Sequence, residues 1–163
     1  MNIIPLLLKE MAEEADTTRK MLSRIPDDKY DWAPHSKSMN ISRLASHIAE
    51  LPGWVTTAFT TNELNFANGD YTPYLATDTK GLLAFFEKNY DQAKTTLQQA
   101  KEEELNLPWL LKNGDQILQE YTKYETVRMA FAQMIHHRAQ LGVYLRLLDI
   151  PIPGSYGPSA DES

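Results

Sequence analysis

Cysteine is absent from this chain of 163 residues, and basic side chains are fewer than acidic ones. Without cysteine there can be no disulfide framework, thiolate zinc site, iron–sulfur cluster or cysteine nucleophile. The 16 Lys and Arg against 22 Asp and Glu give a net charge of −6, and no basic run stands out locally. Because phosphate binding needs a basic surface, we do not expect nucleic acid to be the main partner.

Long hydrophobic runs are missing as well. No segment approaches the roughly 20 apolar residues of a membrane span, so no membrane association is expected. The N-terminus lacks the basic start and the long apolar run of a signal peptide, which favours a cytoplasmic protein. The hydrophobic fraction of 42% and the charged fraction of 23% are typical of an ordered globular protein. A chain of this length is expected to form one domain, residues 1–163.

Four segments carry helical periodicity, with apolar residues recurring at spacings of three and four. Their apolar stripes cover residues 7–25, 41–59, 82–97 and 127–148. Thr122 and Glu125 fit a capping box, which predicts where the last helix begins. With so little strand pattern, the sequence predicts an all-α protein, a four-helix bundle in which the later connections are long.

Three features interrupt the periodicity. Residues 62–77 hold Gly and Pro and are expected to form a loop. Residues 105–121, with a turn at Asn113-Gly114-Asp115, favour extended structure or a short hairpin. Pro52 and Gly53 lie inside the second helical segment and are expected to kink it.

Two of the four histidines lie at the edges of apolar stripes. At about 100° per residue, His47 projects about 60° from Leu44, and His137 about 60° from Met134. Gln133 precedes His137 by four residues, so both side chains share a helix face. Two facing helices could bring His47, Gln133 and His137 together, and imidazole is a preferred ligand of zinc, nickel, copper and iron.

Structural roles also account for these histidines and their neighbours. From the residues alone, a hydrogen-bonded structural histidine is the more common occupant of such a position. Glu50 and Trp54 share the flank of His47, and Tyr144 shares that of His137. Arg138 lies within the apolar arc of the last helix, where an ion pair with an acidic residue of the first or second helix is expected ahead of substrate anion binding.

Standard catalytic motifs are missing. There is no Glu-x-x-His, which excludes the di-iron carboxylate bundles. There is also no His-Glu-x-x-His, Gly-x-Ser-x-Gly or glycine-rich phosphate loop.

The stretch at residues 37–54, which contains His47, resembles the second helix of the DinB-like family, a group of damage-inducible four-helix-bundle proteins. A stronger likeness runs through His136-His137-Arg138-Ala139-Gln140-Leu141, residues 144–146 and residues 151–162. This resemblance implies a bundle with a divalent-metal site of three histidines, for zinc, nickel or iron. His47 and His137 match two of them, and Gln133 stands where the family has the third.

The resemblance also implies a class of function. Relatives include thiol-dependent S-transferases, so we expect a metal-dependent transferase or hydrolase acting on a small molecule, with a metal-activated thiol or water. Glu50 would be a general base or would orient His47, while Trp54 and Tyr144 would contact the ligand. A homodimer is a further expectation from the family. The alternative is a non-catalytic, metal-free small-molecule-binding or stress-response protein of the same fold.

Overall fold

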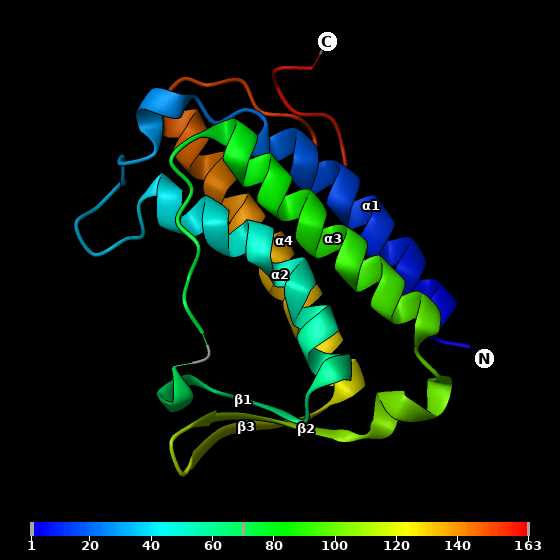
Figure 1. Cartoon of the computed structure of the whole chain (residues 1–163). Helices are drawn as coiled ribbons and strands as arrows, with labels where there is room; N and C mark the ends of the chain where they lie inside the picture. Colours follow the sequence, from blue (N-terminus) through cyan, green and yellow to red (C-terminus); the bar gives the residue numbers. More distant parts are fainter. Residues whose placement is uncertain (1, 70, 163) are drawn as a thin grey trace.

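The computed structural model describes residues 2–69 and 71–162, and it confirms the four-helix bundle. The four long helices are α1 (Ile4–Leu22), α2 (Ile41–Thr60), α3 (Thr79–Gln99) and α4 (Lys123–Leu147). Helix α2 packs against both α3 and α4, and α1 packs against the same two helices (Figure 1). No helix within these described residues combines the length and apolar character needed to cross a membrane.

Side-chain caps define where three of the helices begin. The Asn40 and Asp78 side chains accept hydrogen bonds from the first turns of α2 and α3. At α4, Thr122 and Glu125 form the predicted capping box, with each side chain bonded to the backbone of the other residue. Each cap satisfies backbone N–H groups that have no acceptor inside the helix.

The all-α prediction is wrong in one respect, because the chain also forms a three-stranded sheet. Its strands are β1 (Glu63–Asn65), β2 (Pro108–Asn113) and β3 (Gln116–Thr122), with β1 parallel to β2 and β2 antiparallel to β3. Short 3₁₀ helices are η1 (Asp27–Lys29), η2 (Phe66–Asn68) and η3 (Glu102–Asn106). The sheet lies at the end of the bundle where α2 ends and α4 begins (Figure 1).

One contact fastens the sheet to the end of α2, and another joins β1 to the hairpin of β2 and β3. Trp109 on β2 is fully buried, and its indole N–H donates to the Thr61 hydroxyl at 3.1 Å. At the hairpin turn, Gly114 has φ +61°, a value that glycine adopts without strain. The amide of Asn65 bonds both to the N–H and to the C=O of Gly114, which ties β1 to the hairpin. The hairpin expected within residues 105–121 is therefore present, and burial of Trp109 stabilises it.

Pro52 lies inside α2 where the core changes from one cluster of side chains to another. The buried apolar residues of α2 between Ile41 and Leu51 pack with Leu141 in one cluster, whereas Val55 and Ala58 pack with Phe131 in the other. The axis of α2 changes direction along its length (Figure 1), as expected where proline removes a helical hydrogen bond.

Candidate metal centre

His47 is fixed in place by its neighbours on one face of α2. Its Nδ1 lies 2.6 Å from Oε1 of Glu50, one turn further along the helix. The Tyr71 hydroxyl donates to the same carboxylate oxygen at 2.7 Å. Since a carboxylate only accepts, the Nδ1 of His47 carries a proton, and its Nε2 is the nitrogen available to other groups.

Gln133 on α4 presents its oxygen to that second nitrogen. The amide nitrogen of Gln133 donates to Sδ of Met129 at 3.0 Å, so the amide oxygen is turned the other way. Oε1 of Gln133 lies 3.2 Å from Nε2 of His47. The expected meeting of α2 and α4 at these two side chains is therefore present.

His137 completes the group from the next turn of α4. Its ring lies edge-on to that of His47, with 4.8 Å between the centroids. Its Nδ1 is 2.8 Å from Oε1 of Gln140. Both histidines thus have Nδ1 engaged by a side-chain oxygen, the arrangement that commonly orients a metal-binding imidazole to ligate through Nε2.

The surroundings shift the pKa values of the two histidines in opposite directions. Burial opposes protonation of His47, but its hydrogen bonds to Glu50 and Gln133 outweigh that effect, so the pKa of His47 is raised. Burial lowers the pKa of His137, and the nearby rings of His47 and His136 add to this. The lowered pKa of His137 favours the neutral form that binds a metal, whereas the raised pKa of His47 means that a metal competes with a proton there up to a higher pH.

A cavity of about 710 Å³ opens beside these side chains. Its walls come from α2 and the end of the preceding connection, from the segment between α2 and α3, and from β2 and α4. The lining residues are Met39, Arg43, His47, Glu50, Trp54, Phe66, Tyr71, Pro73, Tyr74, Leu75, Leu111, Gln133 and His137. A volume of this size fits a small organic molecule.

Two serines of α2 fasten the wall formed by the α2–α3 connection. The Ser42 hydroxyl donates to the C=O of Ala76 at 2.6 Å, and the N–H of Ala76 donates to the Ser46 hydroxyl at 2.8 Å. Ala76 is fully buried. This clamp holds the preceding residues, among them Tyr71 and Leu75, over the cavity.

Ser46→Ala is expected to destabilise the protein by about 1–3 kcal/mol, because the buried N–H of Ala76 would lose its acceptor. Chemical denaturation measures the change. Ser23→Ala is the matched control, since Ser23 is exposed and should change stability by less than about 0.5 kcal/mol. Equal stability of the two variants would show that the clamp does not hold the wall.

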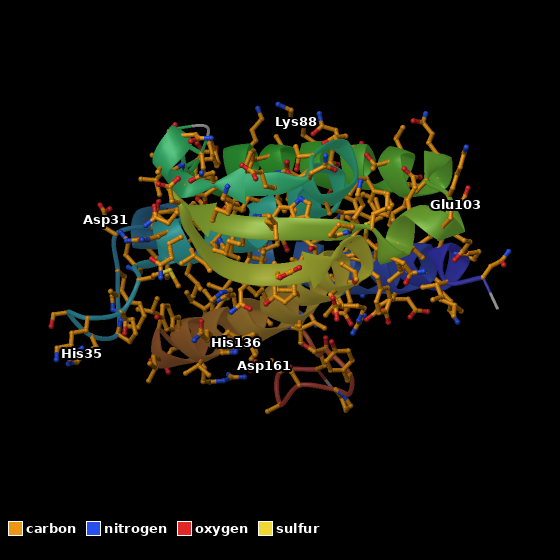
Figure 2. All side chains as sticks on the ribbon, turned by 90° about the horizontal axis from the view of Figure 1, so that it is seen from below. Asp31, His35, Lys88, Glu103, His136 and Asp161 are labelled. Atoms are coloured by element: carbon orange, nitrogen blue, oxygen red, sulfur yellow. The ribbon has the colours of Figure 1, made fainter. Side chains whose placement is uncertain are left out.

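Some of the other predicted residues line the cavity, and others lie away from it. Trp54 lines the cavity, as does Glu50. Tyr144 instead packs edge-on against Trp32, at 5.7 Å between centroids, and is not among the lining residues of this cavity. His136 is exposed on the outer side of α4, as expected, and Figure 2 shows it at the periphery.

Three residues at the site were missed in the sequence. Tyr71 comes from a loop without periodicity, so no local pattern connects it with Glu50. Arg43 precedes His47 by four residues and Gln140 follows His137 by three. Those two spacings place side chains on a shared helix face and could have identified both.

The chemistry of the donor set is compatible with a divalent metal, with two imidazoles and one weaker amide ligand. Within residues 2–69 and 71–162, no group of three or more His, Cys, Asp or Glu side chains could hold a metal ion. Two imidazoles and the neutral oxygen of Gln133 do converge, with both Nδ1 atoms already engaged. An amide oxygen is an accepted but weaker ligand than imidazole for zinc, nickel or iron.

Fold and site together define a helical-bundle protein with a cavity that bears two histidines and a glutamine from facing helices. The chain belongs to the DinB family, whose sequence model matches residues 1–163. The protein is 26% identical over 163 residues to the uncharacterized protein YrdA of Bacillus subtilis (strain 168), covering 95% of this chain and 89% of YrdA.

Solved structures show the same fold. A DinB-like protein from Bacillus cereus superposes with a TM-score of 0.73 at 18% identity, covering 92% of this chain and 95% of the other. The DinB-like protein YjoA of Bacillus subtilis gives 0.70 at 18% identity, with 92% and 96% covered. A mycothiol-dependent maleylpyruvate isomerase gives 0.59 at 16% identity, with 85% of this chain and 60% of the isomerase covered.

Proposed function

We propose that this cavity is the site of a metal-dependent transferase or hydrolase acting on a small molecule. A divalent cation, zinc, nickel or iron, would be held by His47, Gln133 and His137. The observation that carries the proposal is the convergence of these side chains from two helices beside a cavity of about 710 Å³. The Nδ1 atom of His47 already contacts Glu50, and the Nδ1 atom of His137 already contacts Gln140.

The chemistry of such a site is the activation of a nucleophile. A bound divalent cation would lower the pKa of a thiol or a water molecule and so provide a nucleophile at neutral pH. Glu50 holds the Nδ1 proton of His47 and keeps the ring oriented. Burial and the bond to Glu50 raise the pKa of Tyr71, so its hydroxyl stays protonated and remains a donor.

A thiol as the co-substrate is supported by one structural neighbour. The mycothiol-dependent maleylpyruvate isomerase shares this fold and, by its name, uses a low-molecular-weight thiol. The present chain has no cysteine of its own, so a thiol in the reaction would have to enter from solution. The cavity beside His47 offers the space for one.

Elemental analysis by mass spectrometry tests the proposal on protein purified with its affinity tag removed. Near-stoichiometric metal is expected in the wild type and loss of the metal in His47→Ala. His136→Ala is the matched control, because His136 is an exposed histidine of α4 and should leave the metal content unchanged. No metal in any of the three proteins, even after addition of zinc, nickel or iron, would reject the metal-dependent function.

One observation favours a second candidate, a metal-free small-molecule-binding protein. The 3.2 Å contact between His47 and Gln133 is itself a hydrogen bond when His47 is protonated, and the pKa of His47 is raised. In that case His47 would donate to Glu50 and to Gln133 at once, and the polar wall would need no cation. The elemental analysis separates the two candidates directly.

A further inference from the structure

Arg43 lines the cavity and forms no ion pair with another described residue. Four of the six arginines form ion pairs with carboxylates: Arg19, Arg128, Arg138 and Arg146. Arg43 makes no such pair with any residue in the described parts of the chain, yet it lies on the cavity wall one turn before His47. The side chain of Arg43 is exposed and donates no hydrogen bond to another described residue, so its guanidinium can bind an anion that enters the cavity, often through two parallel hydrogen bonds.

The acidic side chain of the cavity wall does not neutralise Arg43. Within residues 2–69 and 71–162, Glu50 is the acidic residue that lines the cavity, and its Oε1 already accepts from both His47 and Tyr71. The positive charge of Arg43 instead acts on His47 and Tyr71, where it opposes the rise of their pKa values. Since Arg43 lies one turn before His47 on α2 and lines the same cavity, its positive charge is close to the polar end of the cavity.

Most of the remaining wall is apolar and aromatic. Four aromatic side chains line the cavity: Trp54, Phe66, Tyr71 and Tyr74. The rings of Phe66 and Tyr71 meet edge-on, with 5.9 Å between their centroids. Leu111 contributes the surface from β2. Such a wall favours a ligand with a hydrocarbon or aromatic body.

We propose that this site takes a small organic anion, an apolar or aromatic body bearing a carboxylate that Arg43 binds, with the body held by the aromatic wall. The inference rests on the proposed function insofar as it names the substrate class of the same cavity. Anion binding by Arg43 needs no metal, so the two can be tested apart.

Isothermal titration calorimetry with two probes of equal size tests this inference. The probes are 4-phenylbutyrate and its neutral amide, 4-phenylbutanamide, added to tag-free protein that has been treated with a chelator. The carboxylate is expected to bind about tenfold or more tightly than the amide, since hydrogen bonds to charged groups are the stronger ones. Arg43→Gln should abolish this preference. Arg24→Gln, which removes an exposed arginine outside the cavity lining, should preserve it.

Each other outcome has a defined meaning. Equal binding of the two probes, binding of neither, or a preference that survives Arg43→Gln would overturn the inference. A preference that appears only after metal is restored would assign the carboxylate to the metal, which supports the proposed function and overturns the role of Arg43. A preference that depends on Arg43 in a protein that takes up no metal would support the inference while the metal-dependent function fails.

Discussion

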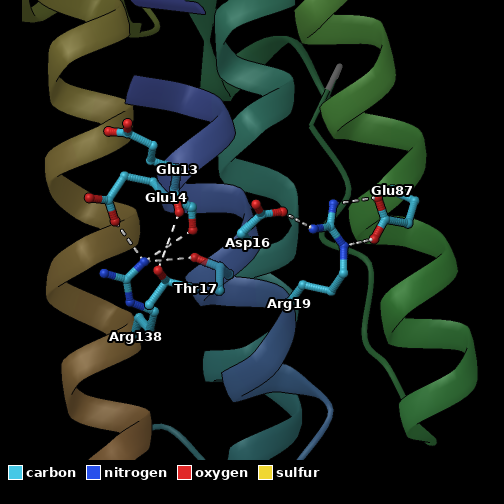
Figure 3. Close-up of polar contacts among 8 residues, drawn as sticks. Glu13, Glu14, Asp16, Thr17, Arg19, Glu87 and Arg138 are labelled. Atoms are coloured by element: carbon cyan, nitrogen blue, oxygen red, sulfur yellow. Dashed lines mark hydrogen bonds and ion pairs between the residues drawn. The ribbon is translucent and has the colours of Figure 1, made fainter. Parts of the chain in front are cut away.

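Arg138→Met is expected to lower the free energy of unfolding by about 3–5 kcal/mol. The side chains of Arg138 and Glu14 are only 2% and 9% exposed, and Oε2 of Glu14 lies 2.7 Å from Nη1 of Arg138. Removing the guanidinium would leave a carboxylate buried between α1 and α4 with no cation to balance it. The ion pair expected with the first or second helix is thus present; its partner is Glu14 of α1, and both side chains are buried (Figure 3).

Beside the ion pair, Arg138 donates hydrogen bonds to α1 and to the C-terminal segment. Both hydrogens of Nη1 have acceptors, the backbone C=O of Glu14 at 3.2 Å and the Thr18 hydroxyl at 3.0 Å. Oε2 of Glu14 is consequently held by charge rather than by a directed hydrogen bond. The Tyr156 hydroxyl donates to Oε1 of Glu14 and accepts from Nη2 of Arg138, so the same pair fastens the C-terminal segment.

Arg19→Met is the matched control. Arg19 pairs with Glu87 between α1 and α3, but these side chains are 35% and 39% exposed (Figure 3). Water solvates both ions there, so its loss should cost no more than about 1 kcal/mol. Denaturant unfolding measures both variants. Equal losses of stability in the two variants would show that burial does not decide the effect of removing the arginine. The double variant Arg138→Met with Glu14→Leu should recover part of the lost stability, because no unpaired charge remains.

The helices were predictable because their signals are local. Apolar spacing identified all four, and the capping residues Asn40, Asp78 and Thr122 stand directly before the helices they begin. The sheet was not predictable to the same degree. Strand β1 has three residues and pairs with β2 across more than forty positions, which no local pattern records.

The candidate site was also predictable only in part. Helical projection correctly placed His47 and Gln133 on facing surfaces, since a helix face follows from spacing alone. It could not place Tyr71, whose position depends on the clamp between Ala76 and Ser46 thirty residues away. Projection also put Tyr144 on the flank of His137, but the ring packs against Trp32, a residue of the α1–α2 connection.

Gln133→His is expected to raise the affinity for zinc or nickel by about 10- to 100-fold. The amide oxygen at position 133 already lies 3.2 Å from Nε2 of His47, and His137 follows one turn later on α4. An imidazole at 133 would supply a stronger donor from the same helix face and a third nitrogen ligand. Equilibrium dialysis against a competing chelator measures the change.

The control for this gain is Gln98→His, which adds a histidine to the exposed face of α3, away from the cavity lining, and should leave metal affinity unchanged. Metal should also raise the melting temperature more in Gln133→His than in the wild type, because a ligand that binds only the folded state stabilises it in proportion to log affinity. Unchanged affinity in Gln133→His would mean that His47 and His137 do not share one ion. A gain that His47→Ala removes would show that ligands from α2 and α4 act together, as the convergence of the two helices requires.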